Sequence, residues 1–182
     1  MKTEQPTLTT ERLILRPFTF NDADVVAALA GDRRVAEMTQ NIPHPYSPEA
    51  AVEWIRSHPS RYDQNEEVVF AIERKAEGDL IGAVGLVHTI RDRKGELGYW
   101  VGVPYWNSGY CTEAARAVVA FGFSAWGMHR IQARHYTKNL ASGRVMEKIG
   151  MTYEGCLRQC VLKWGEYLDV CIYGILETDE TR

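Results

Sequence analysis

One segment near the middle of the chain limits its fold most strongly. An apolar run at residues 97–103 is followed by Pro104, by a turn containing Gly109 and by an alanine-rich stretch that begins near Tyr110. Proline ends a central strand because it cannot donate to the ladder, and glycine permits a tight turn. The first N–H groups of a helix have no intrahelical partners and carry partial positive charge. The segment therefore predicts a strand, a short turn and a helix whose first turn can bind an anion.

The residues of this turn indicate which anions it can bind. It has no lysine followed by serine or threonine, as in a P-loop, and it lacks the three glycines of the dinucleotide fingerprint. An acyl-CoA fits better, because amides alone can hold its diphosphate. The polar positions of the helix, Glu113, Arg116 and Ser124, fall on one stripe, which predicts that the rest is buried against a sheet. Ordinary α/β connections share this layout, so a purely structural link stays open.

Length and charge exclude several classes of protein. The 182 residues, 45% of them hydrophobic, fit one domain, which we place at residues 9–178 between tails at 1–8 and 179–182. Lys and Arg number 21 against 24 Asp and Glu, so the net charge of −3 disfavours nucleic acid as the main partner. No apolar run approaches the ~20 residues that span a bilayer, and the polar start shows no apolar signal segment. We therefore expect no membrane partner and a cytoplasmic location.

Four cysteines raise the question of a metal site or a disulfide. Their spacing matches no zinc ribbon, and no pair of histidines lies at ligand spacing. We expect reduced, mostly packed thiols and no bound metal. Cys111 lies near the predicted anion site, but a nucleophilic thiol needs a paired histidine, and the sequence shows none nearby.

The remaining patterns predict a mixed α/β fold around one sheet. Strands are expected at 12–16, 68–72, 80–87, 96–103 and 130–136, with at least two more between 151 and 176 around a turn at 163–166. Helices are expected from an N-cap at Asn21 to residue 30, and at 47–56, 110–126 and 139–149. Only the strands at 96–103 and 130–136 are joined by a crossover helix, so they should be parallel. The sheet should be mostly antiparallel, with six or seven strands and helices on both faces.

With these elements placed, the chain resembles the GNAT superfamily of N-acetyltransferases, in particular its RimJ and RimL branch of ribosomal-protein-alanine acetyltransferases. The resemblance covers most of the chain, from Thr9 to Thr178. It rests on TERLILRP at 10–17, LGYWV at 97–101, GYCTEA at 109–114, NLAS at 139–142 and EKIGM at 147–151. Trp106 and Cys111 depart from the family's phosphate turn, which usually has Gln or Arg at the first position and Gly or Ala at the second. A main-chain cradle does not depend on either side chain.

The resemblance implies acetyl-CoA as co-substrate and an amine as acceptor, with a protein N-terminal α-amine favoured. A polyamine, an amino acid or an aminoglycoside is an alternative acceptor, because the loops at 39–46 and 156–167 would contact the acceptor and determine which one binds. Four aromatic residues would shape the acceptor pocket, unless they belong to the core or to an interface: Tyr46, Trp54, Trp164 and Tyr167. The coenzyme would contact the main chain of Val101 and Val103, the turn and helix start at Asn107, Ser108, Gly109, Tyr110, Cys111 and Thr112, and the pair Asn139 and Ser142.

The resemblance also assigns two proton-transfer roles. Glu96, at the head of the central strand, is the implied base, acting directly or through water; the alternative is a solvated carboxylate beside Lys94. Ser142 is the implied acid near the CoA sulfur, whereas the simpler interpretation is a first-turn helix residue after an N-cap at Asn139. A coenzyme sensor without turnover is the competing function. A homodimer through the late strands is compatible with the resemblance.

Overall fold

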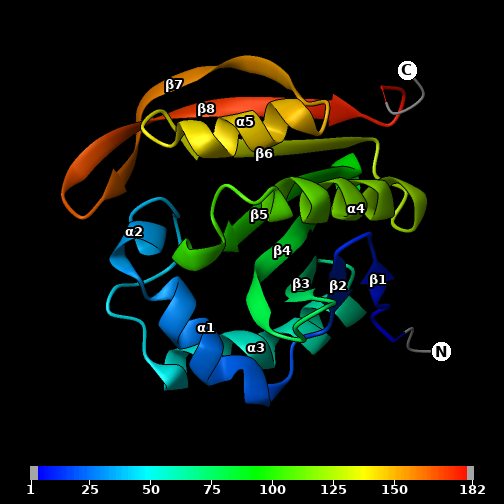
Figure 1. Cartoon of the computed structure of the whole chain (residues 1–182). Helices are drawn as coiled ribbons and strands as arrows, with labels where there is room; N and C mark the ends of the chain where they lie inside the picture. The colour runs from blue at the N-terminus through cyan, green and yellow to red at the C-terminus, as the bar shows by residue number, and fades with distance from the viewer. Residues whose placement is uncertain (1–3, 180–182) are drawn as a thin grey trace.

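The computed structural model describes residues 4–179, and within them eight strands form one twisted sheet (Figure 1). The strands follow the order β1-β2-β3-β4-β5-β6-β8-β7. Their bounds are β1 Leu8–Thr9, β2 Leu13–Arg16, β3 Glu67–Arg74, β4 Leu80–Thr89, β5 Lys94–Val101, β6 Arg130–Tyr136, β7 Thr152–Lys163 and β8 Glu166–Leu176. Neighbouring strands are antiparallel except β5 and β6, which confirms the predicted fold class and its parallel pair. The two-residue β1 takes the count above the six or seven strands expected.

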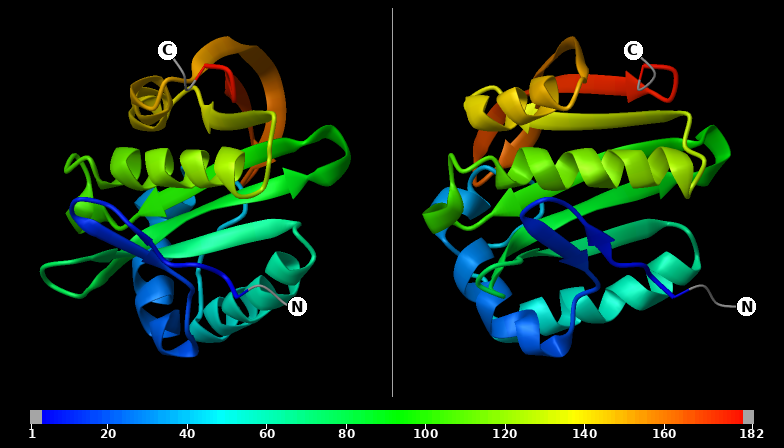
Figure 2. Two further views of the ribbon diagram at one scale, coloured as in Figure 1. Left: turned by 90° about the vertical axis from the view of Figure 1, so that its right-hand side faces the viewer. Right: turned by 45° about the vertical axis from the view of Figure 1, so that its right-hand side comes forward.

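Helices cover both faces of the sheet (Figure 2). α1 (Ala23–Ala30) and α3 (Pro48–Asp63) pack on one face, and α4 (Tyr110–Ser124) and α5 (Leu140–Lys148) pack on the other. The short helix α2 (Arg33–Ala36) and the 3₁₀ turns η1 (Phe20–Asp22), η2 (Ile90–Asp92) and η3 (Val103–Tyr105) lie in the connections. Within residues 4–179, no helix combines the length and the apolar character needed to cross a bilayer.

Two helix boundaries differ from the sequence prediction for local reasons. The first helix is preceded by η1, whose N-cap is Thr19 and where the backbone N–H of Thr19 donates to the Asp22 carboxylate at 2.8 Å. Asn21 therefore lies inside η1, and Asp22 takes its place as the N-cap of α1. The second predicted helix does begin after Ser47, whose hydroxyl caps it, but it continues beyond Pro59. Proline inside a helix removes one backbone hydrogen bond, which the surrounding packing here offsets.

A glycine sets how closely α4 approaches the sheet. A Cβ atom at Gly122 would stand 2.7 Å from Leu86 Cδ1 and 2.9 Å from Ile131 Cδ1, closer than real contacts allow. α4 therefore lies directly on β4 and β6, and its apolar side joins the main core cluster together with residues such as Val118 and Phe70. The burial that the sequence predicted for this helix is confirmed, and it gives the turn before the helix a rigid base.

The parallel pair separates halfway along its length. β5 and β6 are paired from Lys94 with Arg130 to Leu97 with Ala133, where their recorded ladder ends. Beyond that point, residues 98–101 pair with β4, and residues 134–136 pair with β8. β5 also ends at Val101, two residues earlier than predicted, because the chain turns into η3 before Pro104. The facing edges of the two strands are therefore open to a third molecule.

Candidate active site

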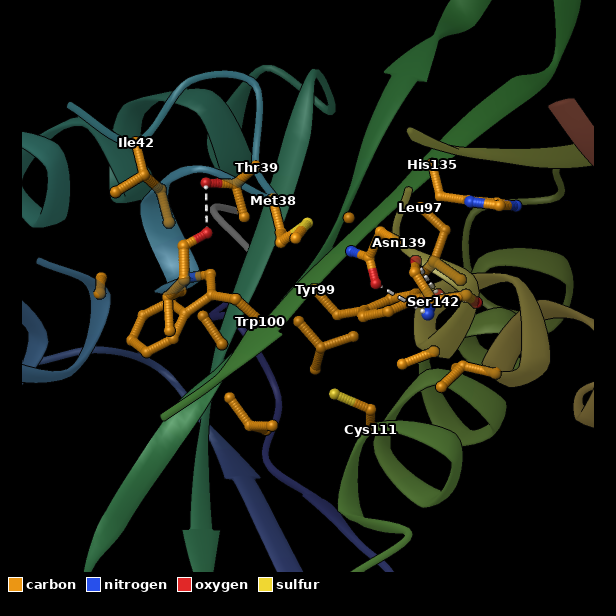
Figure 3. Close-up of a pocket in the computed structure, with 18 of the residues that line it drawn as sticks. Met38, Thr39, Ile42, Leu97, Tyr99, Trp100, Cys111, His135, Asn139 and Ser142 are labelled. Atoms are coloured by element: carbon orange, nitrogen blue, oxygen red, sulfur yellow. Dashed lines mark hydrogen bonds between the residues drawn. The ribbon is translucent and has the colours of Figure 1, made fainter. Parts of the chain in front are cut away.

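A cavity of about 680 Å³ lies where β5 and β6 separate. Its lining comes from both faces of the sheet: from the start of α4 and from α5 on one side, and from α1, α2 and the loop at 39–46 on the other. Figure 3 shows Tyr99, Cys111 and Ser142 on one side of β5, with Ile42 and Trp100 on the other. The cavity thus connects two ends through the sheet. We call the end beside α4 the coenzyme end and the end beside α1 and α2 the acceptor end, after the roles that the resemblance implies.

The turn before α4 carries two residues in the left-handed region. Asn107 has φ 60° and Gly109 has φ 80°; asparagine tolerates this region and glycine adopts it freely. Both residues line the cavity together with Tyr110, Cys111 and Thr112. Their predicted contact with the coenzyme remains a prediction. Ser108 does not line the cavity, and its carbonyl instead accepts a hydrogen bond from Arg12 at 3.0 Å. The free N–H groups of the first helical turn therefore face the coenzyme end.

Arg12, the residue just before β2, contacts this turn and the start of α4. Its backbone N–H and its Nε donate to Glu113 at 2.8 and 2.7 Å, and the hydroxyl of Thr10 donates to the same carboxylate at 2.6 Å. Burial alone would raise the pKa of Glu113, but these hydrogen bonds hold it below its usual value. The guanidinium also lies over the Tyr110 ring. A positive charge therefore stands beside the helix start, a role that the sequence analysis did not assign to Arg12.

The open edge of β5 presents Val101 to the gap. Gly102 donates to Ile81 of β4, and successive residues of a strand turn their backbone groups to opposite edges, so Val101 faces β6. Its carbonyl accepts from the indole nitrogen of Trp106 at 2.9 Å, which leaves its N–H for a ligand. Val103 lies in η3, and its carbonyl accepts from Trp106 N at 3.2 Å. Of the two predicted main-chain contacts, only Val101 lines the cavity.

Ser142 is placed in the cavity by two neighbours. The side chain of Asn139 accepts from the Ser142 N–H at 3.2 Å, which makes Asn139 the N-cap of α5. The Tyr99 hydroxyl lies 2.9 Å from the Ser142 hydroxyl and donates to the Ser142 carbonyl at 3.0 Å (Figure 3). Burial raises the pKa of Tyr99 well above its ordinary value, so the phenol stays protonated at neutral pH. Ser142 is thus both a first-turn helix residue and a cavity residue.

Glu96 lines the cavity and is ion-paired across the parallel strands. Arg134 Nε donates to Glu96 Oε1 at 2.7 Å, and Gln132 Nε2 donates to Oε2 at 3.3 Å. The side chain keeps 32% of its surface exposed, so solvent or a substrate can reach it. The partners of Glu96 are Gln132 and Arg134 of β6. The alternative from the sequence, a solvated carboxylate beside Lys94, named a different neighbour.

Cys111 points into the coenzyme end as a protonated thiol. Burial raises the pKa of this cysteine to about 12, so very little thiolate exists at neutral pH. The sequence prediction that Cys111 is no nucleophile remains a prediction, but this environment supports it.

The acceptor end is mainly apolar, and only some of the predicted aromatic residues reach it. Tyr46 and Trp54 line it, whereas Trp164 and Tyr167 do not. Trp164 instead stands 5.8 Å from the His44 ring, at the contact between the β7–β8 hairpin and the loop at 39–46. Sequence reasoning missed several other lining residues: Met38, Tyr99, Trp100, Arg134 and Tyr136. The alternation of side chains along β5 and β6 was the available signal for the four strand residues.

The fold, with a cavity in the gap between two separating strands, is shared with solved acetyltransferase structures. The chain belongs to the acetyltransferase (GNAT) domain family, whose model matches residues 12–152. It is 34% identical over 177 residues to the N-acetyltransferase YoaA of Bacillus subtilis, with 96% of this chain and 99% of that protein covered. The chain is therefore an N-acetyltransferase with acetyl-CoA as co-substrate, which favours the enzyme over the coenzyme sensor.

Solved structures share this fold over nearly the full chain. A GNAT-family acetyltransferase from Bacillus anthracis matches with a TM-score of 0.85 and 29% identity, covering 95% of this chain and 99% of that one. RimL, a ribosomal L7/L12 alpha-N-protein acetyltransferase in complex with coenzyme A, matches with a TM-score of 0.86 and 16% identity, covering 94% and 98%. The fold resemblance to the RimJ and RimL branch is therefore confirmed.

Proposed function

We propose that this protein acetylates a primary amine, with the N-terminal α-amine of a protein or peptide as the favoured acceptor, by direct attack in a ternary complex. The observation that carries the proposal is the cavity that passes between β5 and β6. Acetyl-CoA entering from the α4 side and an amine entering from the α1 side would meet inside the sheet. Holding two reactants in contact removes much of the entropic barrier of a bimolecular reaction.

The coenzyme end suits a diphosphate and a pantetheine arm. The amides at residues 107–112 would hold the diphosphate, with the charge of Arg12 beside them. The N–H of Val101 would pair with the arm, which would lie against the open edge of β5 as an added strand. Asn139 and Ser142 would contact the arm near its sulfur.

The reaction requires one bond to form, one to break and two protons to move. The amine nitrogen attacks the thioester carbonyl, the C–N bond forms and the C–S bond breaks. Glu96 would take the proton that the amine loses, directly or through water. The CoA thiolate would take a proton from the Ser142 hydroxyl, and Tyr99 would pass its own proton to Ser142 across the 2.9 Å between the two oxygens. Tyr99 would regain a proton from solvent, and Glu96 would release to solvent the one it took from the amine. Products are the acetylated amine and CoA as a free thiol.

The state of Cys111 favours direct attack over an acetyl-cysteine intermediate. A thiol that has a pKa of about 12 is a poor nucleophile at neutral pH, because the thiolate is the reacting form. No covalent intermediate is needed when both substrates share one cavity. The acetyl group would therefore pass to the amine in a single transfer.

The test uses purified full-length protein, acetyl-CoA and a short peptide with a free N-terminus. We expect CoA release and a peptide that carries one acetyl group on its α-amine. Glu96→Gln should lower kcat by about a hundredfold while acetyl-CoA binding stays unchanged. Glu67→Gln, which alters the other carboxylate of the lining, serves as the matched control. A wild-type protein that binds acetyl-CoA and leaves every peptide unmodified would contradict the proposal.

A further inference from the structure

The carboxylates that line the acceptor end are all paired with arginines. Within residues 4–179, the lining of this end contains two carboxylates, and each already has an arginine partner. Glu96 pairs with Arg134 at 2.7 Å, and Glu67 pairs with Arg61 at 2.6 Å. An acceptor with several ammonium groups would have to displace these arginines. The charges therefore suit an acceptor that brings one amine and no further positive charge.

Gly98 leaves the floor of the acceptor end open. Side chains alternate along a strand, so Glu96, Gly98 and Trp100 of β5 share the face opposite Tyr99. A Cβ atom at Gly98 would have no heavy atom within 4 Å, which means that the space above this residue is empty. The empty space lies between the proposed base and the Trp100 ring, where the body of an acceptor would sit.

The walls around this space are apolar. Trp100 packs on one side against the core cluster of α1 and α3, and Met38 and Ile42 stand on the same side of β5 in Figure 3. Val69 and Val87 complete the apolar lining from β3 and β4. Such a surface gains free energy by covering an aliphatic or aromatic group, and it would desolvate a charged one at a cost.

One residue that lines the cavity carries a buried polar atom without a hydrogen-bond partner among residues 4–179. Tyr136 is 5% exposed, lines the cavity, and its hydroxyl makes no hydrogen bond with the described residues. It lies two residues after Arg134 on β6 and therefore on the same face as the Glu96–Arg134 pair. Buried hydroxyls are normally hydrogen-bonded, so this one is suited to a polar group that a ligand supplies. A peptide carbonyl adjacent to the reacting amine is such a group.

From these four features we infer that the acceptor is an α-amine on a peptide whose first side chain is apolar, and that Tyr136 donates a hydrogen bond to its first peptide carbonyl. The inference rests on the proposed function and narrows it to one class of peptide. The apolar side chain lies in the space above Gly98 against Trp100, and the amine lies beside Glu96. Polyamines and peptides with a charged first residue are disfavoured, because the charged side chains that line the acceptor end are already ion-paired: Arg34, Glu67, Glu96 and Arg134.

The first test compares acceptors. The full-length protein is given acetyl-CoA and tripeptide amides X-Ala-Ala in which X is Leu, Phe, Ala, Lys or Glu, with spermidine as a further acceptor. The Leu and Phe peptides should have kcat/KM values at least about tenfold above those of the Lys and Glu peptides and of spermidine. Peptides acetylated without this order would overturn the inference and leave the proposed function standing. No acetylation of any peptide would overturn both.

The second test fills the space above Gly98. Gly98→Val should lower kcat/KM for the Leu peptide at least about tenfold, because the added methyl groups occupy the site of its side chain. Gly98→Ala, the smaller matched change, should have less effect. Acetyl-CoA should bind both variants as it binds the wild type, which also shows that they fold. A Gly98→Val enzyme that acetylates the Leu peptide at the wild-type rate would overturn the placement.

The third test isolates the Tyr136 contact. Tyr136→Phe should lower kcat/KM about fivefold to tenfold for the Leu peptide, the loss expected for one hydrogen bond. It should leave kcat/KM unchanged for isoamylamine, which has the leucine side chain and an amine but no carbonyl. Equal losses for both acceptors would show a structural effect and contradict the hydrogen bond, as would no loss for either.

Discussion

Tyr99 and Ser142 are separated by 43 positions in the chain, yet their hydroxyl groups lie 2.9 Å apart in the cavity. Tyr99 reaches this place because it alternates with Trp100 along β5 and so faces α5, whose first turn holds Ser142. Its raised pKa keeps the phenol protonated at neutral pH, so Tyr99 can hydrogen-bond to Ser142 and be the source of its replacement proton. The two residues should therefore act as one proton-donating unit in the proposed reaction.

Tyr99→Phe and Ser142→Ala should each lower kcat about tenfold or more, and the double variant should lose little beyond the larger single loss, because both remove the same proton path. The KM for acetyl-CoA should change less than kcat in Tyr99→Phe. Steady-state CoA release measured for all four proteins gives the coupling. Losses that multiply in the double variant would mean that the two residues act independently.

The sequence identified Glu96 and Ser142 as candidates through a family pattern, but not their partners. Arg134 has no local motif that marks it, and the LGYWV motif that contains Tyr99 gave that residue no role, because each of the two acts on a residue of another element. The predicted contact at Val103 lies outside the cavity lining for a similar reason. Where a strand ends depends on the turn that follows it, and η3 begins before the proline that the sequence analysis took as the stop.

Among the elements, the β7–β8 hairpin reaches across to the loop at 39–46. Lys163, only 8% exposed, donates to the carbonyls of Gln40 and Ile42 at 3.3 and 3.2 Å. The same ammonium lies 4.9 Å from the centre of the Trp164 ring. Gln40 and Ile42 line the acceptor end, so this lysine ties one wall of the cavity to the hairpin.

Lys163→Met should raise the KM for the acceptor several-fold, because the loop loses two hydrogen bonds to a charged donor and its carbonyls are left unpaired. The KM for acetyl-CoA should stay the same, since the proposed site of that substrate lies on the other face. Lys138→Met is the matched control, because Lys138 is exposed and contacts the same hairpin at Glu166. An equal change in both KM values would show that the lysine stabilises the fold without shaping the acceptor end.

The sequence predicted the strands and helices best where hydrophobic residues recur at a clear period. The strand at 130–136 has the predicted bounds, and the turn at 163–166 joins β7 and β8 as expected. The four-residue α2 and the two-residue β1 were missed, because segments this short contain too few residues to show a period. α2 carries residues into the acceptor end, so the missed helix is also where the site prediction was weakest.

For the molecule as a whole, one buried histidine links stability to pH. His58 is 5% exposed between the rings of Trp54 and Phe18, and neither ring nitrogen has a hydrogen-bond partner among the described residues. Burial, with a smaller contribution from the charge of Arg61, lowers the pKa of His58 to about 4. The folded protein therefore keeps this ring neutral at a pH where the unfolded chain would protonate it.

Because the unfolded state binds the extra proton, the free energy of unfolding should fall as the pH drops from about 6.5 towards 4. Between pH 7 and pH 5, His58 should account for a loss of about 2 kcal/mol. His58→Phe, which keeps an aromatic ring in place, should lose about that much less over the same interval. Urea unfolding of both proteins at the two pH values measures the difference. The same pH dependence in both would rule out His58 as the cause.

The amino-acid sequence by itself determined what depends on neighbouring residues: the periodic strands and helices, the glycine turn before α4 and the order of motifs that indicates the family. The tertiary structure alone decided where β5 and β6 separate, which arginine pairs with Glu96, and that Tyr136 keeps a buried hydroxyl without a partner in the described part of the chain. These features join elements that are far apart in the chain. Their geometry follows from how helices and strands pack together, and local backbone preference does not encode it.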